Sequence, residues 1–368
     1  MSARYRAGVI GLGWMGLLSD LGHRPPQRYE IDDIDRPTPE LDIHRRFHFH
    51  QGQVPHSWAE VMWERPEVDL VAGAERDPKR LRAFGQRYGI QALYEDATQM
   101  LRREQLDIVA IATNTKGRAE LTCLAVQCGV RGIATEKPMV HTLAEADRMV
   151  EACAVAGVPL SGGAIPLNHP AFARARKLLQ DGAIGELLSI EAEAPFAQKQ
   201  YWSYFVDGTP AWVIGSGRSA RRDSGSGSGS DEFGGQGMMV TNAGQCIHFR
   251  KGAGLVRLSG SAGEMSFGSG AAGGWQLWQD IKTTGGRQRV EVPWPPPQIQ
   301  GGYNAVFGLE DIIDCLEGRL DEPKNSGRRV AVALEVEIGL KQSADQGGQR
   351  VDLPLEDRSL GLNYDWFR

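Results

Sequence analysis

A short apolar run that passes directly into three closely spaced glycines constrains this chain more than any other feature. The run Ala7–Ile10 reads as a buried strand, and Gly11, Gly13 and Gly16 follow it at once. Glycine permits a tight turn at the first position, a close approach of backbone to ligand at the second, and close packing of helix on strand at the third. The spacing predicts a dinucleotide fingerprint whose helix N-terminus faces a pyrophosphate.

Strands and helices are expected to alternate through the first part of the chain. Further strands are predicted at Val68–Ala74, Ile108–Ala112, Gly132–Thr135 and Val158–Ser161. Between them, Asp77 can cap a helix that Pro78 begins and Gly89 ends. Thr142 and Glu145 form a capping-box pattern for a helix through Ala156. This alternation with short connections predicts a parallel, doubly wound sheet.

The rest of the chain has a different pattern. After a helix at Pro170–Leu179, strands are predicted at Leu187–Ala194, Ala211–Gly215, Gln236–Thr241, Cys246–Phe249, Leu255–Leu258 and Glu264–Phe267. The Ser/Gly run Ser224–Ser230 is interpreted as a hairpin tip, because strand-like sequence resumes on both sides. Helices are predicted at Asn304–Leu316 and Arg328–Gln342. The pattern favours a largely antiparallel sheet and two domains, at 1–165 and 166–368.

Composition excludes several classes of protein. The net charge of −5 leaves no surplus of cations to neutralise nucleic-acid phosphates. No run of 18 apolar residues predicts a membrane span, and the N-terminus lacks a signal-peptide pattern. The five cysteines are odd in number, contain no C-x-x-C pair, and are interpreted as reduced, mostly buried thiols. A cytoplasmic protein is expected.

The acidic residue that should bind a ribose lies unusually far along the chain. Such a residue normally follows the glycines by roughly 20 positions, whereas Glu75 lies 59 residues after Gly16. The segment 22–56 contains five Pro and five His and lacks helical periodicity, so it is interpreted as an insertion before the helix Ser57–Arg65. Glu75 then takes the ribose-binding place and favours NAD, whereas Arg76 leaves NADP open.

The histidines of the insertion raise the question of a metal site. His44, His48 and His50 lie near several aspartates. Their spacing matches no closed site and no cysteine contributes. We expect no metal here and interpret the segment as a solvated lid.

A resemblance to a known family rests on four short motifs in order. They are Gly8-Val9-Ile10-Gly11-Leu12-Gly13, Ala74-Glu75-Arg76-Asp77-Pro78, Ile111-Ala112-Thr113-Asn114 and Glu136-Lys137-Pro138. With them the chain resembles the glucose–fructose oxidoreductase/inositol dehydrogenase family. The resemblance implies a Rossmann domain followed by an α/β domain with an open, mostly antiparallel sheet, and homodimers or homotetramers. It also implies an NAD(P)-dependent dehydrogenase or reductase of sugars, cyclitols and related polyols.

Lys137 matches the active-site lysine of the family. A partly desolvated lysine at the end of a parallel strand could exchange a proton with a substrate hydroxyl. The alternative is a lysine that only pairs with Glu136 or a phosphate. Cofactor contacts are expected from the glycine loop, Trp14 and Met15 included, and from Glu75, Arg76, Thr113, Asn114, Glu136 and Lys137.

The chain departs from the family where a histidine usually completes the acid–base pair. Gln198, Lys199 and Tyr201 stand in that region and could bind substrate hydroxyls, or the segment could be a helix with Trp202 and Phe205 in the core.

Two further positions near the predicted crevice leave alternatives open. His169 could act as acid or base and contact substrate. Alternatively, Asn168 could cap the following helix while His169 stays exposed. Arg118 stands where relatives often have His and could contact cofactor or solvent.

Three functions remain open from the sequence. The first is the NAD(P)-dependent polyol oxidoreductase. The second is an NAD-retaining enzyme that cleaves glycosides through transient oxidation. The third is a dinucleotide-binding sensor or scaffold without catalysis.

Overall fold

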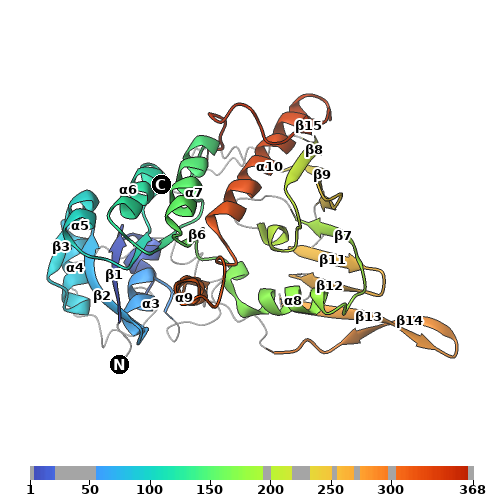
Figure 1. Cartoon of the computed structure of the whole chain (residues 1–368), viewed down its shortest axis with the longest axis horizontal. Helices are drawn as coiled ribbons and strands as arrows, with labels where there is room; N and C mark the ends of the chain where they lie inside the picture. The colour runs from blue at the N-terminus through green and yellow to red at the C-terminus, as the bar shows by residue number, and fades with distance from the viewer. Residues whose placement is uncertain are drawn as a thin grey trace. The chain divides into compact units, whose positions relative to one another are not determined.

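The computed structural model describes residues 4–20, 55–193, 200–217, 233–250, 255–268, 274–296 and 304–363 (Figure 1). Within these ranges the chain forms two compact units. Unit 1 contains the described residues up to 140 together with 145–168 and 304–327. Unit 2 contains 141–144 and the described residues of 169–299 and 328–363. The chain therefore returns to unit 1 after most of unit 2 has been built.

Unit 1 is built on a parallel sheet with the strand order β3-β2-β1-β4-β5-β6. Its strands are β1 (Tyr5–Ile10), β2 (Val68–Ala74), β3 (Ala92–Tyr94), β4 (Ile108–Ile111), β5 (Gly132–Thr135) and β6 (Leu160–Ser161). The order reverses direction beside β1, which is the doubly wound arrangement, and the predicted fold class is confirmed. The short strand β3 was not predicted.

Helices cover both faces of this sheet. They are α3 (Trp58–Glu64), α4 (Pro78–Tyr88), α5 (Ala97–Arg103), α6 (Arg118–Gln127), α7 (Leu143–Ala156) and α9 (Asn304–Leu316), with the short helices η1 (Trp14–Leu18) and η3 (Pro166–Asn168). Apolar side chains of α3, α4 and α9 form one core with β1, β2 and β4. On the other face, Met100 of α5 lies over Gly8 of β1.

Helix α4 follows its predicted signals closely. The Asp77 carboxylate accepts a hydrogen bond from the Lys79 N–H at 2.9 Å, and Pro78 occupies the first turn. Gly89 ends the helix with a left-handed φ of +68°. Phe84 and Tyr88 are buried against the sheet, as their helical spacing predicts.

The two ends of the described chain on either side of residues 21–54 meet at a buried carboxylate. Asp20 accepts hydrogen bonds from the His56 N–H at 3.1 Å, the Ser57 N–H at 2.6 Å and the Ser57 hydroxyl at 2.5 Å. Ser57 in turn caps α3, whose Glu60 N–H donates to its hydroxyl. Residues 20 and 56 are thus neighbours in space, which suits an interpretation of the intervening segment as an insertion.

Unit 2 contains one large sheet in the order β14-β13-β12-β11-β7-β10-β9-β8-β15. Its strands are β7 (Leu187–Ala192), β8 (Pro210–Ser216), β9 (Gln236–Thr241), β10 (Cys246–Phe249), β11 (Val256–Gly260), β12 (Gly263–Phe267), β13 (Trp275–Thr283), β14 (Gly286–Val292) and β15 (Val351–Asp352). Only β7 and β10 pair in parallel. The predicted mostly antiparallel sheet is confirmed. The predicted tip Ser224–Ser230 lies outside the described residues, and β8 and β9 on either side of it pair antiparallel.

Helices α8 (Pro170–Gln180) and α10 (Gly327–Asp345) pack on one face of this sheet. Phe172 of α8 contacts Phe267 and Trp275 edge-to-face, with ring centroids 4.9 and 5.2 Å apart. Val330, Leu334 and Ile338 of α10 are buried, as their spacing predicts. The short helix η4 (Gln200–Tyr204) adds Trp202 to the core.

Two expectations from composition can be compared with the structure. Over the part of the chain described, no helix is both long and apolar enough to cross a bilayer. The five cysteines are all free thiols. Only Cys153 is buried, so the prediction that most of them are buried is wrong.

Candidate active site

The glycine loop after β1 has two glycines that the protein's own packing requires. Gly11 has a φ of +84°, and a Cβ there would lie 2.8 Å from the Thr113 nitrogen. A Cβ on Gly16 would collide with the Gly11 carbonyl oxygen. These two positions therefore hold the turn and the helix start close to β1 and β4.

Gly13 requires a different explanation. Its backbone is extended, with a φ of −73°, and no atom of the described residues lies within 4 Å of where a Cβ would stand. Neither backbone conformation nor packing excludes a side chain at this position. The open space in front of the loop fits a ligand that approaches the backbone closely, as a dinucleotide pyrophosphate does. A glycine at position 13 is thus not required by the protein's own packing, and the space beside it fits a dinucleotide cofactor.

Glu75 stands at the carboxyl end of β2, next to this loop. Its carboxylate accepts hydrogen bonds from the Leu12 N–H at 2.7 Å and the Asp77 N–H at 3.2 Å. Glu75 is half-buried, whereas Arg76 is exposed. The acid is therefore fixed against the glycine loop, and each of its oxygens has further lone pairs for a ribose hydroxyl.

The predicted cofactor residues Thr113 and Asn114 follow β4, the neighbour of β1. Thr113 is half-buried and its hydroxyl donates to the Asn114 carbonyl at 2.8 Å, while Asn114 is exposed. Trp14 and Met15 are half-buried in η1. All of these residues lie at the carboxyl edge of the parallel sheet, where ligands bind in doubly wound folds.

Lys137 follows β5 at the same sheet edge. It is half-buried, and the Lys137–Pro138 peptide bond is cis. Burial lowers the pKa of the Lys137 ammonium, the charge of Arg118 lowers it further, and the Glu136 carboxylate opposes the shift. A lysine in this setting is a stronger candidate for proton exchange than a surface lysine.

Glu136 is buried beside it. Its carboxylate accepts a hydrogen bond from the Trp58 indole N–H at 2.8 Å and from the Lys137 backbone N–H at 3.1 Å. Trp58 is fully buried in α3. Glu136 therefore ties the turn that carries Lys137 to the core of unit 1.

Arg118 corrects the sequence interpretation. Only 1% of the residue is exposed, so the solvent contact offered as one alternative is wrong. Its guanidinium donates to the backbone carbonyls of Thr113, Glu136, Pro138 and Met139. Burial lowers its pKa to about 10, which leaves the group charged at neutral pH.

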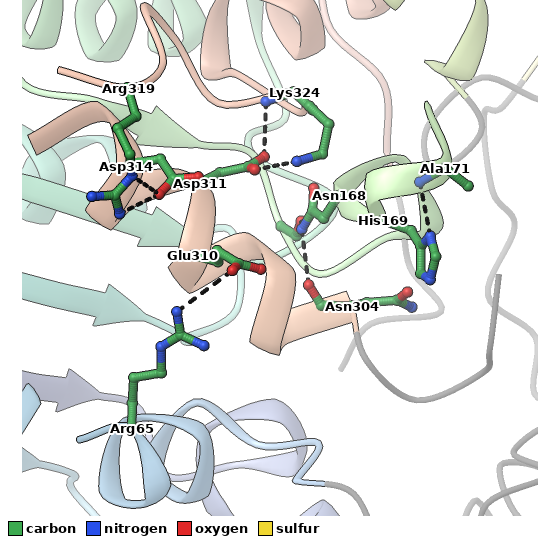
Figure 2. A network of polar contacts seen from close by, with 11 residues as sticks. Arg65, Asn168, His169, Ala171, Asn304, Glu310, Asp311, Asp314, Arg319 and Lys324 are labelled. Carbon is green, nitrogen blue, oxygen red and sulfur yellow. Dashed lines mark hydrogen bonds and ion pairs between the residues drawn. The ribbon is translucent and has the colours of Figure 1, made fainter. Parts of the chain in front are cut away.

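The cap of helix α8 is His169 and not Asn168 (Figure 2). The His169 ring caps α8, because its Nδ1 accepts the Ala171 N–H at 3.0 Å. The residue is 3% exposed, so the exposed alternative is wrong. Asn168 is no cap: its amide donates to the carbonyls of Gly163 and Asn304, both at 3.1 Å. With Nδ1 accepting, the proton of a neutral His169 ring resides on Nε2.

The remaining predicted substrate residues are Gln198, Lys199 and Tyr201. The first two lie outside the described residues. Tyr201 is buried in unit 2, where its ring stacks on Phe172 with centroids 5.5 Å apart, and burial raises its pKa. Trp202 and Phe205 are core residues, as one of the two interpretations held. Substrate contact by Tyr201 stays a prediction.

No group of three or more potential metal ligands occurs in the described ranges. His44, His48 and His50 lie outside those ranges, so the absence of a metal stays a prediction.

The contacts of Gly163, Asn168 and Asn325 that fix the Lys137 backbone were not predicted from the sequence. A Cβ on Gly163 would lie 2.8 Å from the Lys137 nitrogen, and the Gly163 carbonyl accepts the side-chain amides of Asn168 and Asn325. Asn325 lies 162 positions away from Gly163 in the chain. Local sequence patterns cannot reveal such a contact, although the glycine beside a strand end is a usable signal.

Comparison with known proteins agrees with this geometry. Residues 52–163 match the family described as an oxidoreductase family with an NAD-binding Rossmann fold. This stretch is similar to the NAD-binding domain of that family. A D-apiose dehydrogenase from Paraburkholderia graminis is 44% identical over 130 residues, which is 35% of this chain and 33% of that protein. The first relatives are thus matched over a third to less than half of their length.

Solved structures extend the likeness of fold to both units. An NAD-binding oxidoreductase from Klebsiella pneumoniae matches with a TM-score of 0.68 at 15% identity, over 96% of this chain and 100% of that one. A levoglucosan dehydrogenase in complex with NADH and L-sorbose matches with a TM-score of 0.67 at 18% identity, over 96% and 99%. At these identities the likeness concerns the fold, and it covers nearly the whole chain.

Proposed function

We propose that this protein is an NAD-dependent oxidoreductase of sugars, cyclitols or related polyols, with Lys137 as the group that moves the substrate proton. The observation that carries the proposal is the placement of Lys137 on the same sheet edge as the open glycine loop and Glu75. The match of residues 52–163 to an NAD-binding oxidoreductase family supports the reaction type. The named D-apiose and levoglucosan dehydrogenases support the substrate class.

The residues of unit 1 fit NAD better than NADP. Loop N–H groups after Leu12 would hold the pyrophosphate, because those of Gly11 and Leu12 already donate to Ala74 and Glu75. Glu75 would accept hydrogen bonds from the ribose hydroxyls. A carboxylate at this place repels a 2′-phosphate. Arg76 is exposed and adjacent, so it is the residue through which NADP would be tolerated.

Bound NAD supplies the acceptor or donor of hydride, and the protein must handle the proton. In alcohol oxidation the neutral Lys137 amine accepts the hydroxyl proton as the C–H bond is broken. In carbonyl reduction the Lys137 ammonium returns that proton to the new alkoxide oxygen. A lowered pKa brings the two protonation states closer in population at working pH, which is what acid–base catalysis requires.

A second acid–base group would complete the site. His169 is the candidate in the described residues, because its Nδ1 accepts the Ala171 N–H and the neutral ring therefore carries its proton on Nε2. Gln198, Lys199 and Tyr201 are proposed as substrate contacts. Unit 2 would accordingly supply substrate binding.

The unit 2 sheet also carries an ion-pair ladder on the face opposite its apolar core. Arg250 pairs with Glu191 at 2.5 Å, Arg257 with Glu264 at 3.4 Å, and Arg289 with Asp280 at 2.8 Å. Alternating charges of this kind can pair with a second copy of themselves. A homodimer or homotetramer in the cytoplasm is therefore proposed, and sedimentation at low and high salt would test the assembly.

Turnover with NAD tests the proposed function. Purified protein is mixed with NAD or NADP and a panel of polyols and aldoses that includes D-apiose, and absorbance is followed at about 340 nm, where reduced nicotinamide absorbs. The proposal expects NADH formation with at least one substrate. Glycoside cleavage without net NADH would indicate the cofactor-retaining enzyme instead. NAD binding without any turnover would indicate a sensor or scaffold.

A further inference from the structure

Arg118 links the ends of two neighbouring strands through their backbones. One N–H group of its guanidinium donates to the Thr113 carbonyl just after β4. The other nitrogen donates to carbonyls in the turn after β5, those of Glu136, Pro138 and Met139. Lys137 is the residue in the middle of this turn. The planar fork of an arginine can reach both strand ends at once, which the point charge of a lysine cannot do.

Burying the Arg118 guanidinium costs free energy, which its hydrogen bonds must offset. A cation with 1% exposure needs hydrogen-bond acceptors, and both terminal nitrogens of the guanidinium have them, whereas Nε has none among the described residues. Here the acceptors are uncharged backbone carbonyls. The one carboxylate that acts on its charge is Glu136, whose own oxygens accept hydrogen bonds from Trp58 and from the Lys137 N–H. A salt bridge is therefore not the reason for its place.

The turn is also supported from the opposite side. Gly163 has a φ of +116° and leaves no room for a Cβ beside the Lys137 backbone. Asn168 and Asn325 both donate to the Gly163 carbonyl and fix this glycine in place. The Lys137 backbone is thus held between Gly163 and the carbonyls that Arg118 binds.

The charge of Arg118 acts on Lys137 as well as its geometry. The charged groups that act on the Lys137 ammonium are Glu136, which stabilises it, and Arg118, which destabilises it. Burial acts in the same direction as Arg118.

We propose that Arg118 is a positioning residue that fixes the Lys137 turn against the end of β4 and holds a buried cation against the backbone carbonyls of that turn. The significance for catalysis rests on the proposed role of Lys137. The effect of Arg118 on the protonation of the Lys137 amine does not depend on that role. The charge effect and the catalytic consequence can therefore be tested separately.

Competitive labelling of lysines tests the charge effect without any substrate. The full-length protein is treated with acetic anhydride across a pH series, and mass spectrometry of peptides gives the titration of Lys137. In Arg118→Met the loss of a nearby cation should raise the pKa of Lys137, measured as a several-fold fall in neutral amine at a given pH. If Arg118→Met does not fold, Arg118→Gln, which is also neutral but keeps two amide donors, takes its place.

A matched control separates this effect from general loss of stability. Arg87 is also a buried arginine of unit 1, but it pairs with Glu60 in α3. Arg87→Met should lower the melting temperature and leave the titration of Lys137 unchanged. An unchanged titration of Lys137 in the folded Arg118 variant would overturn the charge effect, and so would an equal shift in Arg87→Met.

Arg118→Lys tests the fork itself, because it keeps the charge and loses the geometry. We expect the titration of Lys137 to stay near that of the wild type while kcat falls by roughly 10- to 100-fold, the usual result of misplacing a reacting group by about 1 Å. Wild-type kcat in Arg118→Lys would overturn the positioning role. Failure of the proposed function would appear differently, as absence of turnover in the wild type.

Discussion

Replacing Gly13 by alanine should weaken NAD binding without weakening the fold. In the part of the chain that the structure describes, the added methyl group meets no atom within 4 Å, and the backbone φ of −73° is one that alanine adopts. It would stand in the space through which a phosphate reaches the N–H groups of the loop. Losing one hydrogen bond to a charged group costs about 1.5–3 kcal/mol, and each 1.4 kcal/mol is tenfold in affinity, so NAD binding should weaken roughly 10- to 150-fold.

Gly16→Ala is the matched control in the same loop. Its Cβ would collide with the Gly11 backbone, so the strand and helix must separate. Overpacking of this kind costs about 1–3 kcal/mol, and the melting temperature of the NAD-free protein should fall by about 2–4 °C for each kcal/mol.

Calorimetric titration with NAD and thermal melting of the NAD-free protein measure both quantities for the two variants. Gly13→Ala should change affinity with the melting temperature nearly unchanged, whereas Gly16→Ala should lower the melting temperature. Wild-type NAD affinity in Gly13→Ala would refute the inference that the open space belongs to the cofactor.

Three further predictions follow from buried charges. Burial raises the pKa of Asp20 from 3.8 to about 6, although hydrogen bonds from Ser57 oppose the shift. Because the pKa is higher in the folded state, Asp20 favours folding at low pH. About 3 kcal/mol of unfolding free energy is therefore lost as pH rises through 6. Asp20→Asn should therefore flatten the fall of unfolding free energy in that window, measured by urea unfolding, and an unchanged slope would contradict the burial argument. Arg87→Met leaves the buried Glu60 carboxylate without its ion-pair partner and should cost about 3–5 kcal/mol of stability; a loss below about 1 kcal/mol, the range of surface pairs, would speak against it. Because burial lowers the pKa of Lys137 and the neutral amine is the base, kcat for alcohol oxidation should rise with pH to a midpoint below 10.5, and a rise only above that value would count against the assignment.

Elements with strong local signals could be predicted from the sequence. Strand β2 and helix α4 have their predicted limits, because Asp77, Pro78 and Gly89 fix both ends of the helix through the backbone. Glu75 could be predicted because it directly follows the predicted strand β2, whatever the structure of the segment 22–56. For α4 the determining contacts lie within a few residues along the chain, whereas the Leu12 N–H that fixes Glu75 lies 63 positions away.

Elements defined by distant contacts were missed. Strand β3 has only three residues and pairs with β2 at one edge of the sheet. The hairpin β13–β14 is polar over much of its length, although Gly285 and Gly286 at its turn are a usable signal.

The candidate site divides in the same way. Lys137 is marked by its motif, whereas the role of Arg118 depends on carbonyls 18 to 21 residues away and could not be read from its neighbours. His169 and Asn168 were interchanged because both residue types can cap a helix. Long-range contacts of Asn168 with Asn304, 136 positions away, decide between them.

The rate of NADH formation by Lys137→Met tests the central claim most directly. Lys79→Met serves as the control, since Lys79 is an exposed lysine on α4 of the same unit. With a substrate from the polyol panel, Lys137→Met should lose about 10²- to 10⁴-fold in kcat, the usual contribution of acid–base catalysis. NAD affinity is measured beside kcat, so that a lost cofactor contact of Lys137 is separated from lost proton transfer, and the control should retain full activity. Near-normal turnover in Lys137→Met would contradict the account.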